Sequence, residues 1–127
     1  MKDQGNALNW FEISVQDLDR AKKFYETIFD IVMPVQDMGG ALMAFFPYAP
    51  GSGKVSGALV KGPSHTPSKD GAKIYLNGNP NLDTALSLVE GSGGKVLEPK
   101  FKISDEVGFM AWFSDTEGNV LALHSNH

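Results

Sequence analysis

Two segments of this chain repeat each other and divide it into two halves. Asp17-Leu18-Asp19-Arg20-Ala21 returns 64 positions later as Asn81-Leu82-Asp83-Thr84-Ala85. Each segment follows an apolar run with the alternation typical of a strand, and each begins the apolar stripe of an amphipathic helix. Three further strand-like runs follow each stripe. The repeat therefore predicts an α+β fold made of two tandem βαβββ modules, with eight strands and two helices in total.

The length of 127 residues predicts a single domain spanning 1–127. Module one is expected over about 6–61 and module two over about 72–125. Residues 62–71 between them are rich in proline, glycine and polar side chains, which is typical of a linker. His65 falls in this linker, so we expect it to be exposed to solvent.

The composition excludes several classes of function. The formal net charge is −4 and no cluster of lysine and arginine occurs, so nucleic-acid binding is not expected. No apolar run approaches the ~18 residues that a membrane span needs, and no signal-peptide core is present, so a cytoplasmic protein without membrane contact is expected. The absence of cysteine excludes disulfides, zinc–thiolate sites and thiol nucleophiles.

Strand alternation predicts which side chains face a ligand. Successive residues of a strand point to opposite faces, so the apolar set Phe11, Ile13 and Val15 is expected to pack under a helix and the intervening set to face away. The same logic applies to the first and last strands of module two. The side chains expected to face a shared cup are Trp10, Glu12, Ser14, Lys73, Tyr75, Asn77, Ala122 and His124.

These residues suggest a division of roles. Glu12, partly desolvated beside Trp10, is a candidate general base, and His124 or Tyr75 is a candidate proton donor. Lys73 would hold a carboxylate of the ligand. The remaining ligand-binding candidates are Trp10, Ser14, Asn77 and Ala122. Two alternatives stay open: Glu12 and Lys73 form an internal salt bridge, or Trp10 packs in the core or at a dimer interface.

The motifs themselves resemble a known family. They are Trp10-Phe11-Glu12-Ile13-Ser14-Val15-Gln16-Asp17-Leu18-Asp19-Arg20-Ala21 followed by Phe24-Tyr25, then Gly93-Gly94-Lys95-Val96, Asp115-Thr116-Glu117-Gly118-Asn119-Val120 and Leu123-His124-Ser125. The chain resembles the vicinal-oxygen-chelate superfamily of glyoxalase I, extradiol dioxygenases and bleomycin-resistance proteins. Within it, the glyoxalase-like branch related to lactoylglutathione lyase is the most similar. The resemblance implies a curled eight-stranded mixed sheet forming an open cup, with helices outside and ligand inside, and a homodimer.

The resemblance also implies where a metal would bind. Metal-dependent members use histidine and glutamate from inward-facing strand positions, which correspond here to Trp10, to Lys73 or Ile74, to one residue within Ser56-Gly57-Ala58, and to Ala122. None of these side chains is a good ligand for a divalent cation. We therefore expect no metal and no other cofactor.

Three functions remain open at this stage. The first is a metal-independent lyase or isomerase acting on a small carbonyl or carboxylate compound. The second is a non-catalytic protein that binds or sequesters an aromatic or antibiotic-like molecule in the cup. The third is a vestigial cup on a fold that serves a partner protein, because one scaffold can carry unrelated activities.

Overall fold

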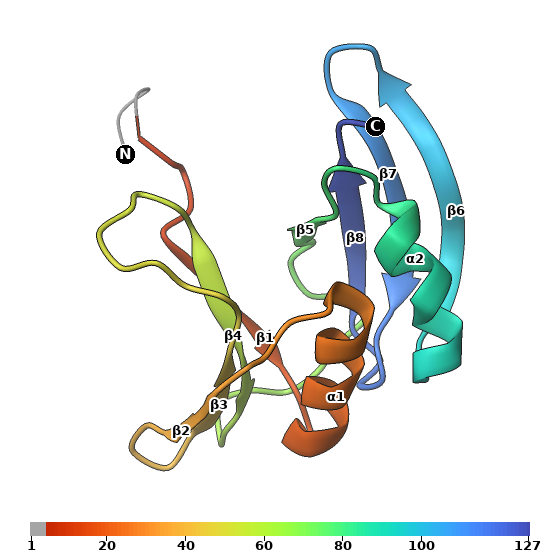
Figure 1. Cartoon of the computed structure of the whole chain (residues 1–127). Coiled ribbons are helices and arrows are strands. Elements are labelled where there is room, and N and C mark those ends of the chain that lie inside the picture. The colour runs from red at the N-terminus through yellow and green to blue at the C-terminus, as the bar shows by residue number, and fades with distance from the viewer. Residues whose placement is uncertain (1–4) are drawn as a thin grey trace.

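The computed structural model describes residues 5–127, and its chain follows the order expected from the repeat (Figure 1). Module one contains β1 (Trp10–Ser14), α1 (Leu18–Phe29), β2 (Val35–Asp37), β3 (Leu42–Phe45) and β4 (Ser56–Lys61). Module two contains β5 (Tyr75–Asn77), α2 (Asp83–Val89), the short 3-10 helix η1 (Glu90–Ser92), β6 (Lys95–Ser104), β7 (Gly108–Ser114) and β8 (Val120–Ser125).

The eight strands form two separate sheets of four. Their orders are β1-β4-β3-β2 and β5-β8-β7-β6, so each module repeats the topology of the other. In each sheet the first strand pairs in parallel with the last, and the other neighbours are antiparallel. No ladder joins the two sheets within residues 5–127. The α+β fold with two βαβββ modules is confirmed, and its sheets are not closed into one.

Helix α1 forms where the apolar stripe predicted it. The side chain of Asp17 accepts a hydrogen bond from the Arg20 amide at 3.0 Å, which satisfies a free donor of the first turn. Phe24, Tyr25 and Ile28 are buried along one face of the helix. Asp30 ends the helix in a left-handed conformation with φ of 52°.

Helix α1 lies between the two modules, and α2 packs against α1 and the second sheet. Figure 1 shows α1 between the two sheets, and α1 and α2 pack against each other. The ring of Phe24 on α1 stacks on Phe113 of β7 at 6.1 Å, and Tyr25 meets Phe46 of module one at 5.6 Å. One hydrophobic core therefore joins both sheets through α1, and it fixes the position of each module relative to the other.

A buried polar network ties module two to α1. The Tyr25 hydroxyl donates to Asp115 Oδ2 at 2.7 Å, and the amide of Asn119 donates to Asp115 Oδ1 at 3.0 Å. Burial, and then the neighbouring Asp115 carboxylate, raise the pKa of Tyr25 well above its ordinary value. The hydroxyl is therefore a permanent donor, and the turn that contains Asp115 is held against the helix.

Strand β6 is longer than the sequence pattern indicates. The sequence predicts a strand only over 95–98, directly before Pro99. The observed strand continues to Ser104, pairing with β7 through three irregularities of register. It lies at the edge of its sheet, where a missing donor is tolerated.

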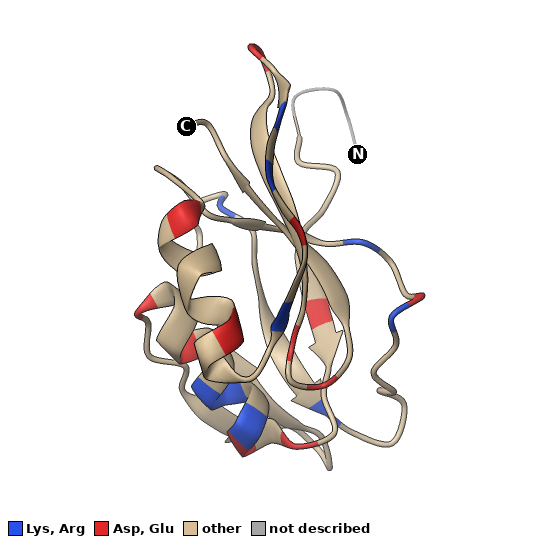
Figure 2. Cartoon of the chain, turned by 90° about the vertical axis from the view of Figure 1, so that its right-hand side faces the viewer, with Lys and Arg blue, Asp and Glu red and all other residues tan. Residues whose placement is uncertain are grey.

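Within the described residues, no helix is long and apolar enough to cross a membrane. Figure 2 shows acidic and basic residues intermixed along the helices and loops of the face in view. No extended basic surface appears on that face.

Candidate functional site

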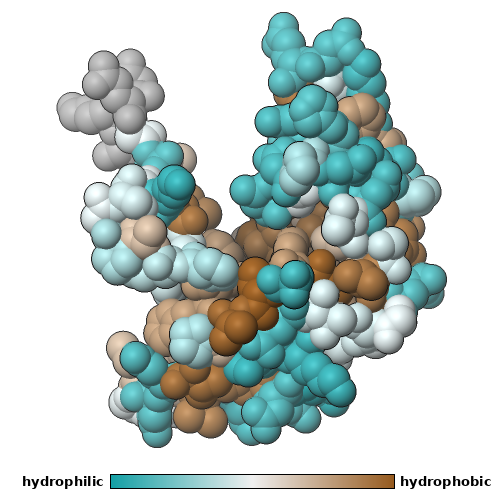
Figure 3. Space-filling view, viewed as in Figure 1, coloured by the Kyte–Doolittle hydropathy of each residue, from teal (hydrophilic) through white to brown (hydrophobic). Residues whose placement is uncertain are grey.

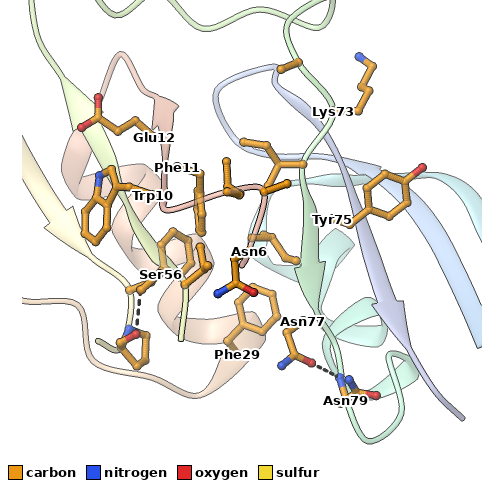
Figure 4. Close-up of a pocket in the computed structure, with 18 of the residues that line it drawn as sticks. Asn6, Trp10, Phe11, Glu12, Phe29, Ser56, Lys73, Tyr75, Asn77 and Asn79 are labelled. Atoms are coloured by element: carbon orange, nitrogen blue, oxygen red, sulfur yellow. Dashed lines mark hydrogen bonds between the residues drawn. The ribbon is translucent and has the colours of Figure 1, made fainter. Parts of the chain in front are cut away.

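A large open cleft lies between the two modules. It has a volume of about 1090 Å³ and is lined by residues from both sheets and from the end of α1. Figure 3 shows the hollow opening between the two halves, with hydrophobic residues at its base. Phe11, Phe29 and Asn6 lie inside the space between the sheets (Figure 4). The cleft is thus lined by apolar side chains that continue the hydrophobic core, together with the side-chain amide of Asn6.

Five of the eight predicted site residues line this cleft: Trp10, Glu12, Lys73, Tyr75 and Asn77. In Figure 4, Trp10 and Glu12 extend from β1 to one side, and Lys73 and Tyr75 extend to the opposite side. Within each strand, alternate side chains lie on the face that the sequence predicts. The face that carries Trp10 and Glu12 and the face that carries Tyr75 nevertheless point away from each other (Figure 4). Glu12 and Tyr75 thus both border the cleft, and their side chains extend to opposite sides of it.

We call the helix-distant face of the first sheet face A. It carries Trp10, Glu12 and Ser14 of β1, and in register beside them Phe45 of β3 and Ala58 of β4. Trp10 contacts Phe45 with ring centroids 6.1 Å apart and contacts Tyr48, from the loop after β3, edge-on at 5.6 Å. Face A is therefore an aromatic surface with one carboxylate in it.

We call the corresponding face of the second sheet face B. It carries Tyr75, Asn77, Met110, Trp112, Ala122 and His124. Tyr75 meets Trp112 edge-on with ring centroids 5.5 Å apart, and both flank Ala122 in the register of the sheet. Tyr75 is 51% exposed, so this aromatic pair is open to solvent. Face B is a second aromatic surface, with an amide and an imidazole nearby.

The two faces are built on one plan. On face A the register aligns Glu12, Ala58 and Phe45 across β1, β4 and β3. On face B it aligns Tyr75, Ala122 and Trp112 across β5, β8 and β7. In each row a central alanine separates an aromatic ring from the side chain of the first strand. The internal repeat of the sequence is therefore matched by two corresponding rows of side chains, which we call the two half-sites.

The polar partners of the candidates differ from those expected. Glu12 Oε1 lies 2.8 Å from His65 Nε2, so a linker residue, and not Lys73, is its hydrogen-bond partner. The Lys73 ammonium instead donates to the carbonyl of Lys69. The alternative of a Glu12–Lys73 salt bridge is wrong for this chain. His65 was expected to be solvent-exposed, yet its side chain is only 24% exposed.

The remaining candidates have local partners. His124 Nε2 donates to the carbonyl of Val107 at 2.6 Å, and His124 is not among the residues that line the cleft. Asn77 Oδ1 accepts from the Asn79 amide at 2.9 Å, and its amide nitrogen donates to no group within residues 5–127. Ser14 lines a second, smaller pocket of about 150 Å³ beside Glu12, together with Thr66 and Asn119.

The metal of the related enzymes does not fit these positions. Trp10 and Ala122 offer no lone pair for coordination, and Lys73 would bring a positive charge. No group of three or more histidine, cysteine, aspartate or glutamate side chains able to hold an ion occurs in the described part of the chain. The positions that correspond to the metal ligands of those enzymes therefore carry side chains that do not form a set of metal ligands.

Comparison with known proteins assigns the family. Residues 7–123 match the Glyoxalase/Bleomycin resistance protein/Dioxygenase superfamily. A glyoxylase-like domain-containing protein of Didymella fabae is 31% identical over 119 residues, which cover 91% of each chain. The chain belongs to the Glyoxalase/Bleomycin resistance protein/Dioxygenase superfamily.

Solved structures agree with this assignment. A mutant of glyoxalase I from Zea mays superposes with a TM-score of 0.72 at 22% identity, covering 94% of this chain and 46% of the maize chain. The present chain therefore spans about half the length of that enzyme. TnmS3, an antibiotic binding protein from Streptomyces sp. CB03234, superposes with a TM-score of 0.65 at 25% identity, covering 94% of this chain and 95% of TnmS3.

Proposed function

We propose that this protein binds a flat, largely apolar organic molecule in a cup assembled from two copies of the chain. Face A of one copy and face B of the other form the two walls. The observation that carries the proposal is the pair of equivalent aromatic half-sites that one chain turns in opposite directions (Figure 4). A twofold axis relating two copies would place each half-site opposite its complement.

Exposure of the two faces supports a partner. Large apolar patches on a protein surface mark sites of ligand or protein binding. On face B, Phe101 of β6 lies in register with Met110 and is 39% exposed, and Tyr75, on β5 at the opposite edge of the sheet, is 51% exposed. On face A, Tyr48 is 55% exposed next to Trp10. A homodimer would remove these rings from water and enclose a ligand between them.

The chemistry of the walls suggests the ligand. Trp10 and Phe45 on one wall and Trp112 and Tyr75 on the other present rings to both sides of a bound molecule, which favours a planar aromatic ligand. Similarity to TnmS3, whose printed name describes antibiotic binding, supports an antibiotic-like compound. Carbonyl and hydroxyl groups of such a ligand would meet Glu12, Asn77 and Lys73 at the margins.

A complementation experiment tests the shared site. Trp10→Ala removes a ring from face A, and Trp112→Ala removes one from face B. Each variant alone has two damaged sites per dimer, but a mixed dimer has one site with both walls intact. We expect 2-naphthol to bind the wild-type dimer, to bind neither variant, and to bind a re-equilibrated mixture at about one site per mixed dimer.

Light scattering and nuclear magnetic resonance provide the readouts. Size-exclusion light scattering should give twice the mass of the chain, which is 13.7 kDa. Shifts of the two tryptophan indole N–H signals should report the probe. A monomer at micromolar concentration, or equal binding by both variants and their mixture, would contradict the shared site.

A second candidate function rests on the Glu12–His65 contact. A carboxylate held at 2.8 Å by an imidazole is a suitable general base for removing a proton next to a carbonyl, with Tyr75 or His124 from face B of the other copy returning it. Such a protein would be a metal-independent lyase or isomerase. Deuterium exchange into hydroxyacetone in D₂O, followed by nuclear magnetic resonance, tests this activity. Acceleration that disappears in Glu12→Gln supports the enzyme, and an unaltered background rate eliminates it.

A further inference from the structure

The linker between the modules places His65 against Glu12 on face A. The His65 amide donates to the carbonyl of Gly62 at 3.1 Å and closes a turn directly after β4. Further along, Asn119 Oδ1 accepts from the Ser68 amide at 2.9 Å, while Asn119 Nδ2 donates to the Ser14 carbonyl at 2.8 Å. The linker is thus held by a turn after β4 before the imidazole and is tied to β1 through Asn119 after it, so His65 has a defined position.

Hydrogen-bond chemistry assigns the proton of this imidazole. The carboxylate of Glu12 can only accept, so His65 Nε2, 2.8 Å from Glu12 Oε1, carries a hydrogen and donates it. His65 Nδ1 is buried and has no hydrogen-bond partner in the described residues. A neutral imidazole has a single N–H, and a buried N–H without an acceptor is unfavourable, so Nδ1 carries no hydrogen. The pair therefore bears the negative charge of Glu12 alone.

The pair retains unused capacity to accept hydrogen bonds. A carboxylate has about four acceptor positions, and His65 occupies one of them. The Glu12 side chain is 37% exposed, and Glu12 lines both the main cleft and the smaller pocket beside Ser14. Lys73, which one of the alternatives paired with Glu12, donates to the carbonyl of Lys69 instead. The free acceptors of Glu12 therefore lie beside the Trp10 ring with space for a ligand group.

We propose that the Glu12–His65 pair determines ligand specificity by selecting an aromatic molecule that carries a hydrogen-bond donor, a hydroxyl or amino group, on its ring system. Glu12 receives the donor, and His65 is a positioning residue that holds the carboxylate beside Trp10. An ether at the same place leaves the acceptors without a donor, and a carboxylate meets like charge. This inference rests on the function proposed above.

Three matched probes test the selection: 2-naphthol, 2-methoxynaphthalene and 2-naphthoate. Each is titrated into the full-length wild-type protein, and the indole N–H shift of Trp10 gives the dissociation constant. We expect 2-naphthol to bind at least 10-fold more tightly than the ether, and 2-naphthoate to bind most weakly. In Glu12→Gln the preference for 2-naphthol over the ether should fall below 3-fold, with the affinity for the ether unchanged.

Variants of His65 separate positioning from folding. His65→Phe keeps a ring but removes the donor, so the preference for 2-naphthol should fall about threefold while the ether binds as before. His65→Gln restores an N–H donor and should recover part of the preference, which a merely structural role would not predict. Glu106→Gln changes an exposed carboxylate in the hairpin after β6 and should leave all three affinities unaltered.

The outcomes distinguish the two proposals. Equal binding of 2-naphthol and its ether by the wild-type protein would overturn the selection and leave the shared aromatic site intact. An unchanged preference in Glu12→Gln would also overturn it. If no probe shifts either indole signal at millimolar concentration, the proposed binding function fails and this inference fails with it.

Discussion

The carboxylate of Glu117 and the guanidinium of Arg20 join the last turn of module two to the first turn of α1, with Oε2 and Nε 2.7 Å apart. Glu117 Oε1 also accepts hydrogen bonds from the amides of Gln16 and Asp17, each at 2.8 Å. An anion at the amino end of a helix is stabilised by the free amides and the helix dipole. One buried side chain therefore fastens the two modules together.

Replacing this carboxylate should weaken folding. Glu117→Gln keeps the shape of the side chain but removes the charge that strengthens three of its contacts. We expect a loss of about 1–2 kcal/mol in the free energy of unfolding at pH 7, measured by urea denaturation. Glu106→Gln, at an exposed site, is the control and should have no effect. Coincident unfolding curves for the two variants would contradict the prediction.

The same contact predicts how stability depends on pH. Burial raises the pKa of Glu117, but the hydrogen bonds from Arg20 and from the Asp17 and Gln16 amides outweigh it and lower the pKa from 4.5 to about 2. The folded state thus binds this proton less readily than the unfolded state. Stability from Glu117 is full above about pH 4.5 and is lost as the pH falls towards 2.

Urea denaturation between pH 7 and pH 3 measures this effect. The difference in unfolding free energy between wild type and Glu117→Gln should shrink as the pH falls through this range. A difference that stays constant down to pH 3 would show that the carboxylate is not the group responsible.

The hydroxyl of Tyr25 provides a second test of the junction between modules. Tyr25→Phe removes the donor to Asp115 Oδ2, which then keeps only the Asn119 side-chain amide at 3.0 Å. We expect a loss of about 1–2 kcal/mol, because a buried acceptor is left with one partner fewer. Tyr48→Phe, at an exposed ring, should unfold like the wild type. Equal losses in both variants would indicate that the buried hydrogen bond contributes nothing specific.

Two glycines close in sequence should respond differently to alanine. A Cβ at Gly94 would lie 2.6 Å from the Ser114 carbonyl oxygen and 2.7 Å from the Phe24 ring, so Gly94→Ala must displace packed atoms. A Cβ at Gly91 would meet nothing within 4 Å. We expect Gly94→Ala to lower the unfolding free energy by about 1–3 kcal/mol and Gly91→Ala to leave it nearly unchanged. Thermal melts of the two variants under identical conditions check this difference.

The sequence predicted the local structure because local patterns carry that information. Asp17 and the stripe of Phe24, Tyr25 and Ile28 define α1 without reference to the rest of the chain. Strand alternation likewise predicted that Trp10 and Glu12 share a face, as the register of β1 and β4 shows. The extent of β6 was underestimated, since the position of Pro99 on a sheet edge is a property of the whole sheet.

The relation between the two half-sites could not be predicted in the same way. Periodicity places Glu12 and Tyr75 on defined faces of their own sheets, but the angle between the sheets depends on how α1 and α2 pack in the shared core. The His65–Glu12 contact spans 53 positions, and no local pattern marks it. The only available signal was the Gly62-Pro63 turn before His65, which reverses the linker towards the sheet.

The corresponding rows of side chains on face A and face B determine how single substitutions would affect the proposed site. Ala58 and Ala122 form the floor of the two half-sites, and the groups flanking them come from different repeats of the chain. In the proposed dimer, a substitution in one repeat would alter one wall of the cup while the opposite wall kept its shape. Ligand preference could then be retuned one wall at a time, above a base made by the methyl groups of these two alanines.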